Sequence, residues 1–227
     1  MSFKRIPFIA ALLLLVLFVR SAPLPAPPRT RSAPITGAIV VHVRYDAEKN
    51  ETIATVANVS HKGVTAFGLG VYFAGGRYLE LDREFLGTVD FFHPGTTVDV
   101  VFAYKKEDAK VVVGAVVYVN DTAEVVDERA FKSIIKNRVE NALAYERANE
   151  LLAGSTDAEA VAKQLESEAV LERERNTDDP MPNQGTLNEL ALEIRRTQDF
   201  DALKKKNEEK AAVWRSHANP VVEGKRP

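Results

Sequence analysis

The chain has 227 residues, of which 45% are hydrophobic and 27% are charged, and its formal net charge is −2. This composition is typical of globular proteins and excludes wholesale disorder. The near-neutral charge provides no global basic field, so we expect no nucleic-acid partner. The absence of cysteine excludes disulfides, thiolate metal sites and cysteine nucleophiles.

The N-terminus has the features of an export signal. Lys4 and Arg5 precede the uncharged apolar run of residues 6–19. A spanning helix needs about 20 apolar residues, so residues 1–21 are expected to be a signal peptide or, if uncleaved, an N-terminal anchor. We expect an exported chain that is periplasmic, envelope-associated or secreted, and that meets the membrane only through this leader.

Residues 22–34 contain five prolines. Proline cannot donate a backbone hydrogen bond and biases the chain toward polyproline II, so this segment is expected to be a semi-rigid linker. Two interpretations stay open, a stalk that holds a domain away from the membrane and an unstructured segment that follows the leader.

Residues 35–126 show the short alternating runs of antiparallel β-strands. The apolar runs lie at 39–45, 52–59, 65–73, 77–81, 85–89, 98–104 and 111–119, before a short last strand. Gly75-Gly76 and Pro94-Gly95 mark turns between them. Seven or eight strands at this spacing predict an immunoglobulin-like antiparallel β-sandwich, and the fold class we expect is mainly β with two or three helices after it.

Four residues bear on how this sandwich packs. Phe67 and Val100 lie on the apolar faces of alternating runs and are predicted to be core residues. Gly68 and Gly70 occupy the face opposite Phe67. They indicate a bulge, a close approach of another backbone or a thinly covered exposed face.

At Asp127 the hydrophobic period changes from two toward 3.6. An apolar stripe from Phe131 to Leu152 predicts a helix over 127–154 that docks on the sandwich. Asp127 is the expected N-cap and Gly154 the expected glycine just beyond the last turn.

Residues 155–227 are expected to form a charged helical extension with a loose tail, separable from the sandwich and its docked helix. Thr156 with Glu159, and Thr186 with Glu189, have capping-box spacing and predict helices over 156–175 and 186–214. Their narrow apolar stripes leave three interpretations open: partial packing, partner binding or marginal order.

Three segments of the chain resemble a known group of proteins: Val56–Phe67, the Pro94-Gly95 turn, and Gly114–Glu124. The chain resembles uncharacterised exported proteins of soil bacteria, notably acidobacterial ones, which pair an immunoglobulin-like domain with trailing helices. The resemblance covers roughly residues 35–150. It implies a fold and an extracytoplasmic location, and no catalytic residues define the group.

Candidate sites for chemistry are few. The histidines His42, His61, His93 and His217 lack the close spacing of metal ligands, and we expect them to be solvated, although His61 and His93 could meet if their turns share one end of the sandwich. No elbow motif for a nucleophilic serine and no phosphate-binding glycine loop is present.

Two further patterns contain acidic or nucleophilic residues that could also be ordinary solvated surface. Asp82, Glu84 and Asp90 gather around one loop and could bind calcium or act as acid and base, but Asp-x-Asp-x-Asp spacing is absent. Ser133 and Lys136 have Ser-x-x-Lys spacing without its companion motifs. The surface interpretation is favoured for both, so we expect no catalytic residue, metal site or cofactor.

Two surface patterns complete the candidates. Asn50, Asn58 and Asn120 each begin a glycosylation sequon, which chance explains as well as selection does. The basic run 204–206 lies beside acidic residues and is expected to be a solvated helix face.

The function expected from these features is that of an exported non-enzymatic module with a protein partner or a structural role in the cell envelope. This expectation rests on analogy with other immunoglobulin-like folds. The alternative is a ligand-binding protein or an enzyme whose site lies between the sandwich and the helices.

Overall fold

The computed structural model describes residues 37–73, 76, 78–86, 91–102, 110–174, 181–197 and 199–223. The expected leader, the proline-rich linker and Asp90 lie outside these residues. Among the described residues, no helix is long and apolar enough to cross a membrane.

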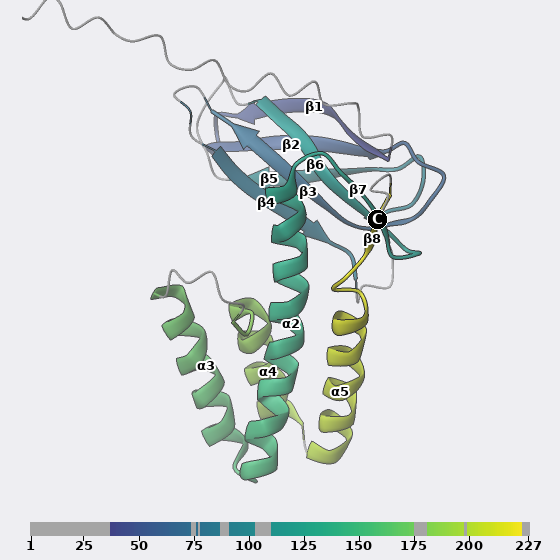
Figure 1. The fold of residues 1–227 in the computed structure, drawn as a ribbon. Helices are drawn as coiled ribbons and strands as arrows, with labels where there is room; N and C mark the ends of the chain where they lie inside the picture. The colour runs from purple at the N-terminus through teal and green to yellow at the C-terminus, as the bar shows by residue number, and fades with distance from the viewer. Residues whose placement is uncertain are drawn as a thin grey trace, which may run out of the picture. The chain divides into compact units, whose positions relative to one another are not determined.

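The described strands form two sheets, followed by helices (Figure 1). The three-stranded sheet has the order β1 (Ala38–Asp46), β2 (Glu51–Asn58), β5 (Thr97–Phe102). The five-stranded sheet has the order β4 (Tyr78–Glu84), β3 (Val64–Tyr72), β6 (Lys110–Tyr118), β7 (Thr122–Val125), β8 (Val221–Val222). Neighbouring strands pair antiparallel except β7 and β8, which are parallel. We call these two sheets together the two-sheet unit.

One apolar core lies between the two sheets. Phe67 is fully buried, and its ring lies 6.0 Å from that of Phe85 and 5.8 Å from that of Phe92. Ala54 and Val56 of β2 belong to the same buried cluster. The prediction that Phe67 is a core residue is confirmed, and Val100 is partly buried against the same core.

The prediction of a further strand over 85–89 is wrong at its first two residues, since Phe85 and Leu86 lie outside any strand and residues 87–90 are not described. The backbone N–H of Phe85 still donates to Thr65 O of β3 at 2.7 Å and also lies 3.1 Å from the Glu84 carboxylate, whereas the N–H of Leu86 donates to that carboxylate at 3.0 Å. Strand pairing ends after Phe85, where the Glu84 side chain accepts from the next backbone donor.

Helix α2 (Glu128–Gly154) docks on the five-stranded sheet, as predicted, but Ala130 and the small residues of the sheet form part of the contact beside Ile134 of the predicted stripe. Asp127 is its N-cap, as predicted, and accepts a hydrogen bond from the N–H of Arg129 at 2.9 Å. A β-carbon built on Gly68 or Gly114 would lie 3.0 or 2.7 Å from the β-carbon of Ala130. Glycine therefore permits the close approach of helix and sheet at Gly68. The pairing of β3 with β6 also shifts register between Gly68 and Leu69, so the close approach and a strand irregularity occur together at this glycine.

Three further helices follow α2 and pack around it. They are α3 (Ala158–Glu174), α4 (Gln184–Arg196) and α5 (Phe200–Ser216). Their buried leucines and alanines form a second core with the far half of α2, where Tyr145, Ala148 and Leu152 are buried. The narrow apolar stripes of these helices left partial packing, partner binding and marginal order open, and the structure shows that the stripes pack against α2 and one another.

The expected helix ends need correction. Gly154 is the last residue of α2, and the extended Ser155 caps it, so no left-handed glycine ends the helix. Asp157, not Thr156, caps α3, and accepts from the N–H groups of Glu159 and Ala160 at 3.0 and 3.2 Å.

The single helix expected over 186–214 is two helices. Asn183 caps α4 and Asp199 caps α5, each through its side-chain oxygen. Asp199 accepts from one of the first N–H groups of a new helix, and Thr197 and Asp199 both have extended backbone.

The expectation of a separable extension with a loose tail is also corrected. After α5 the chain returns to the two-sheet unit, where Val221 N–H donates to Asp121 O and Glu223 N–H donates to Ala123 O, both at 2.7 Å. A strand of two residues beside β7 carries too little pattern to be predicted from sequence.

Candidate functional site

Strand β4 presents three acidic residues to helix α2. Glu80, Asp82 and Glu84 oppose Gly70, Gly68 and Ala66 of β3, the face on which α2 packs. Side chains alternate along a strand, so the residues between these acids point to the opposite face. The small residues of β3 leave room for a row of polar contacts between β4 and the helix.

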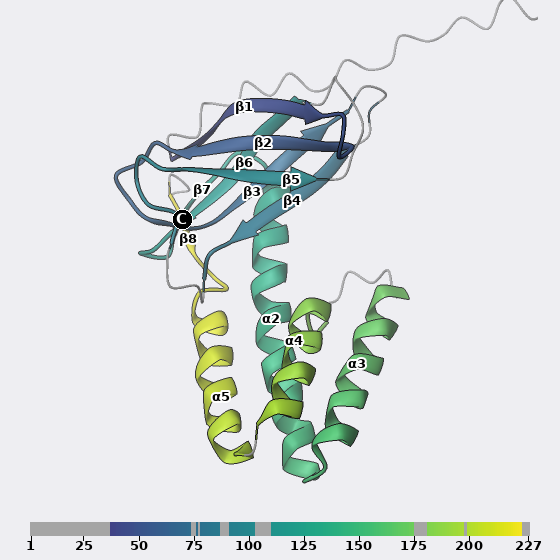
Figure 2. The same cartoon turned by 180° about the vertical axis from the view of Figure 1, so that it is seen from behind.

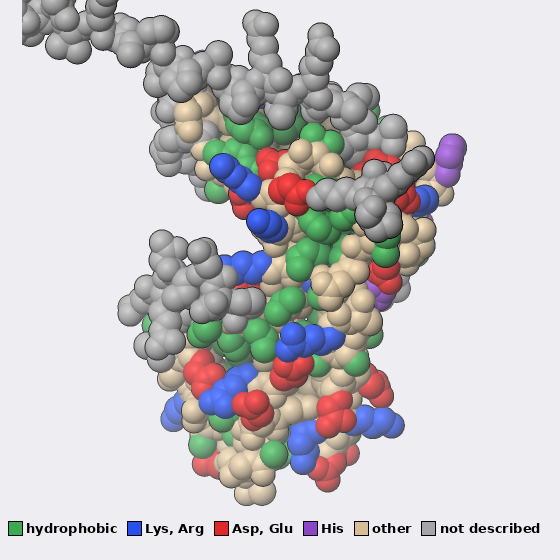
Figure 3. All heavy atoms as spheres, viewed as in Figure 1, with side chains coloured by type: hydrophobic (Ala, Val, Ile, Leu, Met, Phe, Trp, Pro, Cys, Tyr) green, Lys and Arg blue, Asp and Glu red, His purple; other side chains and the backbone are tan. Residues whose placement is uncertain are grey.

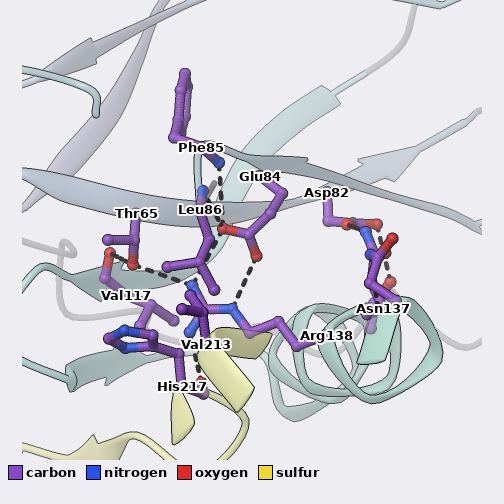
Figure 4. A network of polar contacts seen from close by, with 12 residues as sticks. Thr65, Asp82, Glu84, Phe85, Leu86, Val117, Asn137, Arg138, Val213 and His217 are labelled. Atoms are coloured by element: carbon purple, nitrogen blue, oxygen red, sulfur yellow. Dashed lines mark hydrogen bonds and ion pairs between the residues drawn. The ribbon is translucent and has the colours of Figure 1, made fainter. Parts of the chain in front are cut away.

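At the centre of this row Arg138 of α2 is fully buried (Figure 4). Its Nε and Nη2 atoms donate to the two carboxylate oxygens of Glu84, at 2.8 and 3.2 Å. Nη2 also donates to Thr65 Oγ1 at 3.0 Å, and Nη1 to the backbone oxygen of His217 at 2.7 Å. One guanidinium thus joins β3, β4, α2 and the segment after α5.

A second branch of the cluster runs along α2 from Asp82. Ser133 Oγ and Asn137 Nδ2 donate to the two carboxylate oxygens of Asp82, at 3.2 and 2.6 Å. Asn141 Nδ2 donates to Asn137 Oδ1 at 2.6 Å, and Thr186 of α4 donates to Asn141 Oδ1. The branch therefore connects β4 to α4 through side chains of α2.

The Glu84 carboxylate lies in a low-dielectric setting. Burial raises its pKa, while the Arg138 guanidinium and the N–H groups of Leu86 and Phe85 act in the opposite direction. Burial of a charge is tolerated when the charge is paired and hydrogen-bonded, and four donors converge on this carboxylate, three on Oε1 and one on Oε2.

A separate polar cluster surrounds the start of α2. Tyr78 and Tyr72 donate to Asp127 Oδ2 at 2.7 and 3.2 Å, and the Arg129 guanidinium lies 5.4 Å from the centre of the Tyr78 ring. Burial raises the pKa of Asp127, but the hydrogen bonds from Tyr78 and from the N–H of Arg129 outweigh it and hold that pKa below its ordinary value. The cluster explains why Asp127 caps the helix as an anion.

The structure brings together some of the residues that the sequence suggested as sites, in a different combination. Asp82 and Glu84 point to the same face, and Ser133 meets Asp82 rather than Lys136. Lys136 pairs with Glu140 at 3.7 Å. Sequence reasoning missed Arg138 and Asn137, whose only signal is their position among apolar residues on the sheet-facing side of α2.

Only the backbone oxygen of His217 joins this cluster, and the described histidine rings make other contacts or face solvent. His42 is exposed on β1, and His61 and His93 lie in turns that share one end of the two-sheet unit, because Asn58 Nδ2 donates to both Lys62 O and Phe92 O. The His217 ring bonds the Asp121 carboxylate. Over the described part of the chain, no three His, Asp or Glu side chains are placed to hold a metal ion.

The remaining surface candidates have structural roles. Asn58 is fully buried, whereas Asn50 and Asn120 lie in exposed turns. Lys204 pairs with Asp201 at 2.8 Å, and Lys206 pairs with Glu193. Figure 3 shows acidic and basic side chains interspersed over the helical part.

Two shallow hollows lie on the surface of the described residues. A groove of about 550 Å³ between α2 and α5 is lined by Glu146, Asn149, Glu208 and Arg215, and Arg215 spans it to Glu146 at 2.7 Å. A smaller hollow of about 350 Å³ adjoins the turn 59–62. Comparison of the chain with protein-family models, with curated proteins and with solved structures finds no match.

Proposed function

We propose that the chain is an exported, non-enzymatic module that binds a protein partner or supports the cell envelope. In this proposal the leader directs export and the proline-rich linker connects it to the module. The two-sheet unit is the binding platform, and the helices brace one of its faces.

The proposed platform is an immunoglobulin-like sandwich, and strand order supports this. The orders β1-β2-β5 and β3-β6-β7 match strands A-B-E and C-F-G of an immunoglobulin domain, and β4 beside β3 takes the place of strand C′. The chain has no cysteine for the disulfide between sheets, and its single tryptophan, Trp214, lies in α5. Buried Phe67 on β3 provides the large aromatic side chain of the core.

The observation that carries the non-enzymatic proposal is the satisfaction of the polar cluster. Asp82 accepts from Ser133 and Asn137, and Glu84 accepts from Arg138 and two backbone N–H groups. A general acid or base needs an oxygen within reach of a substrate proton. Here the carboxylate oxygens of Asp82 and Glu84 accept hydrogen bonds from groups of the same chain. The polar cluster therefore acts as a structural joint between β4 and α2, and we call it the polar joint.

The outer face of the three-stranded sheet is the platform we favour for a partner. Helix α2 packs on β3, β4 and β6 of the other sheet, and Figure 2 shows β1, β2 and β5 with no helix in front of them. Val101 is 51% exposed on this face, beside Asp99, which accepts from Thr55 at 2.6 Å. Mixed apolar and polar surface of this kind is typical of non-obligate interfaces.

The test has two parts. A reporter fused after residue 34 should appear outside the cytoplasm, and its retention inside would contradict export. A photoreactive side chain at Val101 should then crosslink one envelope protein in living cells, while the same probe at exposed Val170 of α3 should not capture it. Equal capture from both positions would contradict a platform on the three-stranded sheet.

The alternative of an enzyme or ligand-binding protein would have to use Asp82 and Ser133, since both side chains are only half-buried at the edge of β4. Asp82→Asn preserves size and removes the carboxylate. Loss of a measured ligand or activity in this variant, with an unchanged melting temperature, would replace the proposed function with the alternative.

A further inference from the structure

Three exposed apolar side chains gather at one end of the two-sheet unit. Val59, Phe91 and Val119 are 48%, 40% and 44% exposed and come from three different turns. A β-carbon built on Gly63 would lie 2.4 Å from the Phe91 ring and 3.0 Å from Cγ1 of Val119, so both side chains cover this glycine. We call this group the apolar tip.

The chain leaves the described structure toward its leader at the same end. Gly37 is the first described residue, and its backbone oxygen accepts from the N–H of Val59 at 3.1 Å. Residues 22–36 separate Gly37 from the expected leader. At roughly 3.1 Å per residue in polyproline II this linker reaches about 45 Å, which lets the tip approach the bilayer.

Two charged residues of the described turns at this end, Lys62 and Asp121, are paired within the chain. Lys62 contacts Glu223 at 2.5 Å and lies 4.7 Å from the centre of the Tyr118 ring. Asp121 bonds His217. Paired charges lower the cost of bringing this end against lipid headgroups, which isolated charges would raise.

We propose that the apolar tip docks on the surface of the lipid bilayer that holds the leader. This inference rests on the proposed function and on retention of the leader as an anchor. Tethering raises the local concentration of the bilayer at the tip, so shallow insertion of Phe91 and its two neighbours is enough to orient the module. The β1–β2 turn, at the other end of β2, then points away from the membrane.

The absence of cysteine permits a direct test on the full chain. Val119→Cys, labelled with a polarity-sensitive fluorophore, is reconstituted through the leader into phosphatidylcholine and phosphatidylglycerol vesicles that contain acyl-chain-brominated lipid. We expect blue-shifted emission and quenching by the brominated lipid. Labels at Val101→Cys, on the outer sheet face, and Glu48→Cys, in the β1–β2 turn, should show neither.

Two variants of Phe91 test the chemistry in the Val119→Cys background. Phe91→Ser should abolish most of the quenching because the tip loses its largest apolar side chain, whereas Phe91→Leu should retain it. Equal loss in both variants would contradict docking through apolar contact.

Vesicle flotation separates the two proposals. A chain that floats with a solvent-exposed label at position 119 overturns docking and leaves the proposed export and tether intact. A chain that does not float overturns the anchor on which docking depends. Quenching at position 48 equal to that at 119 would also overturn docking, because the module would then have no preferred end.

Discussion

Replacement of Arg138 by methionine tests the view that the polar cluster is a structural joint. The guanidinium is fully buried and makes four hydrogen bonds, two to Glu84 and one each to Thr65 and the His217 backbone. Methionine fills a similar volume and makes none of them. The Glu84 carboxylate, whose own side chain is 11% exposed, loses its charged partner.

The size of the effect follows from that unpaired charge. Removal of one partner from a buried ion pair costs about 3–5 kcal/mol, because the other charge stays buried without compensation. Arg215 provides a matched control, since it makes a two-point ion pair with Glu146 but both side chains are 40% exposed or more. Arg215→Met should therefore cost about 1 kcal/mol or less.

Urea unfolding measures both free energies, and the pH dependence identifies the cause. Without Arg138 the pKa of Glu84 should rise further, because burial then acts with less opposition. A group with a raised pKa stabilises the fold below its ordinary pKa and loses that contribution as the pH rises. The cost of Arg138→Met should therefore be smaller at pH 4 than at pH 7. Arg138→Met and Arg215→Met of equal cost at pH 7 would refute the reasoning.

Three further changes test other parts of the structure. Asp127→Ala removes the α2 cap and the acceptor of both tyrosines and should cost about 2 kcal/mol at pH 7. Because the pKa of Asp127 is lowered, its contribution to stability is present above about pH 4 and is lost as the pH falls through the depressed pKa. The melting temperatures of the variant and the unchanged protein should therefore converge in acid. A difference that stays constant with pH would contradict the role of the Asp127 anion. Phe67→Asp buries an unpaired carboxylate and should cost more than about 3 kcal/mol by urea unfolding; a near-native midpoint would contradict the core assignment. Truncation after Gly154 exposes Tyr145 and Leu152 and should lower the melting temperature markedly, whereas an unchanged melt would restore the separable extension.

Most of the β structure could be predicted because its signals are local. Alternation along β1, β2, β3 and β5, and the nearly continuous apolar run of β6, place these strands within a few residues of the observed bounds. The hydrophobic period changes at Asp127, which is the N-cap of α2. The caps of α3 and α4 were misplaced by one residue and by three, because neighbouring polar residues compete for the same N–H groups. Strand β8 depends on the distant partner β7 and has no local signal.

The polar joint could not be predicted for a different reason. Edge acids such as Asp82 and Glu84 are usually solvent-facing, and an arginine in a long helix is usually exposed. In the sequence, only Gly68 and Gly70 of β3 indicate that another element approaches this face of the sheet. Close approach is there one of three interpretations, beside a bulge and a thinly covered exposed face. The joint can be predicted only when it is already known that β4 pairs with β3 and that α2 docks on the same face of the sheet.

We infer that the joint fixes strand register more than it adds stability. A buried ion pair is often no more stabilising than apolar side chains of similar volume, so Arg138 and Glu84 contribute little over such a pair. A shift of β4 by one residue would instead place Arg83 or Phe85 opposite Arg138, a repulsive contact or an unpaired charge. Replacement of both partners by apolar residues should therefore preserve the free energy of unfolding better than Arg138→Met does. The cost should appear as loss of a single register, visible as doubled amide resonances along β4.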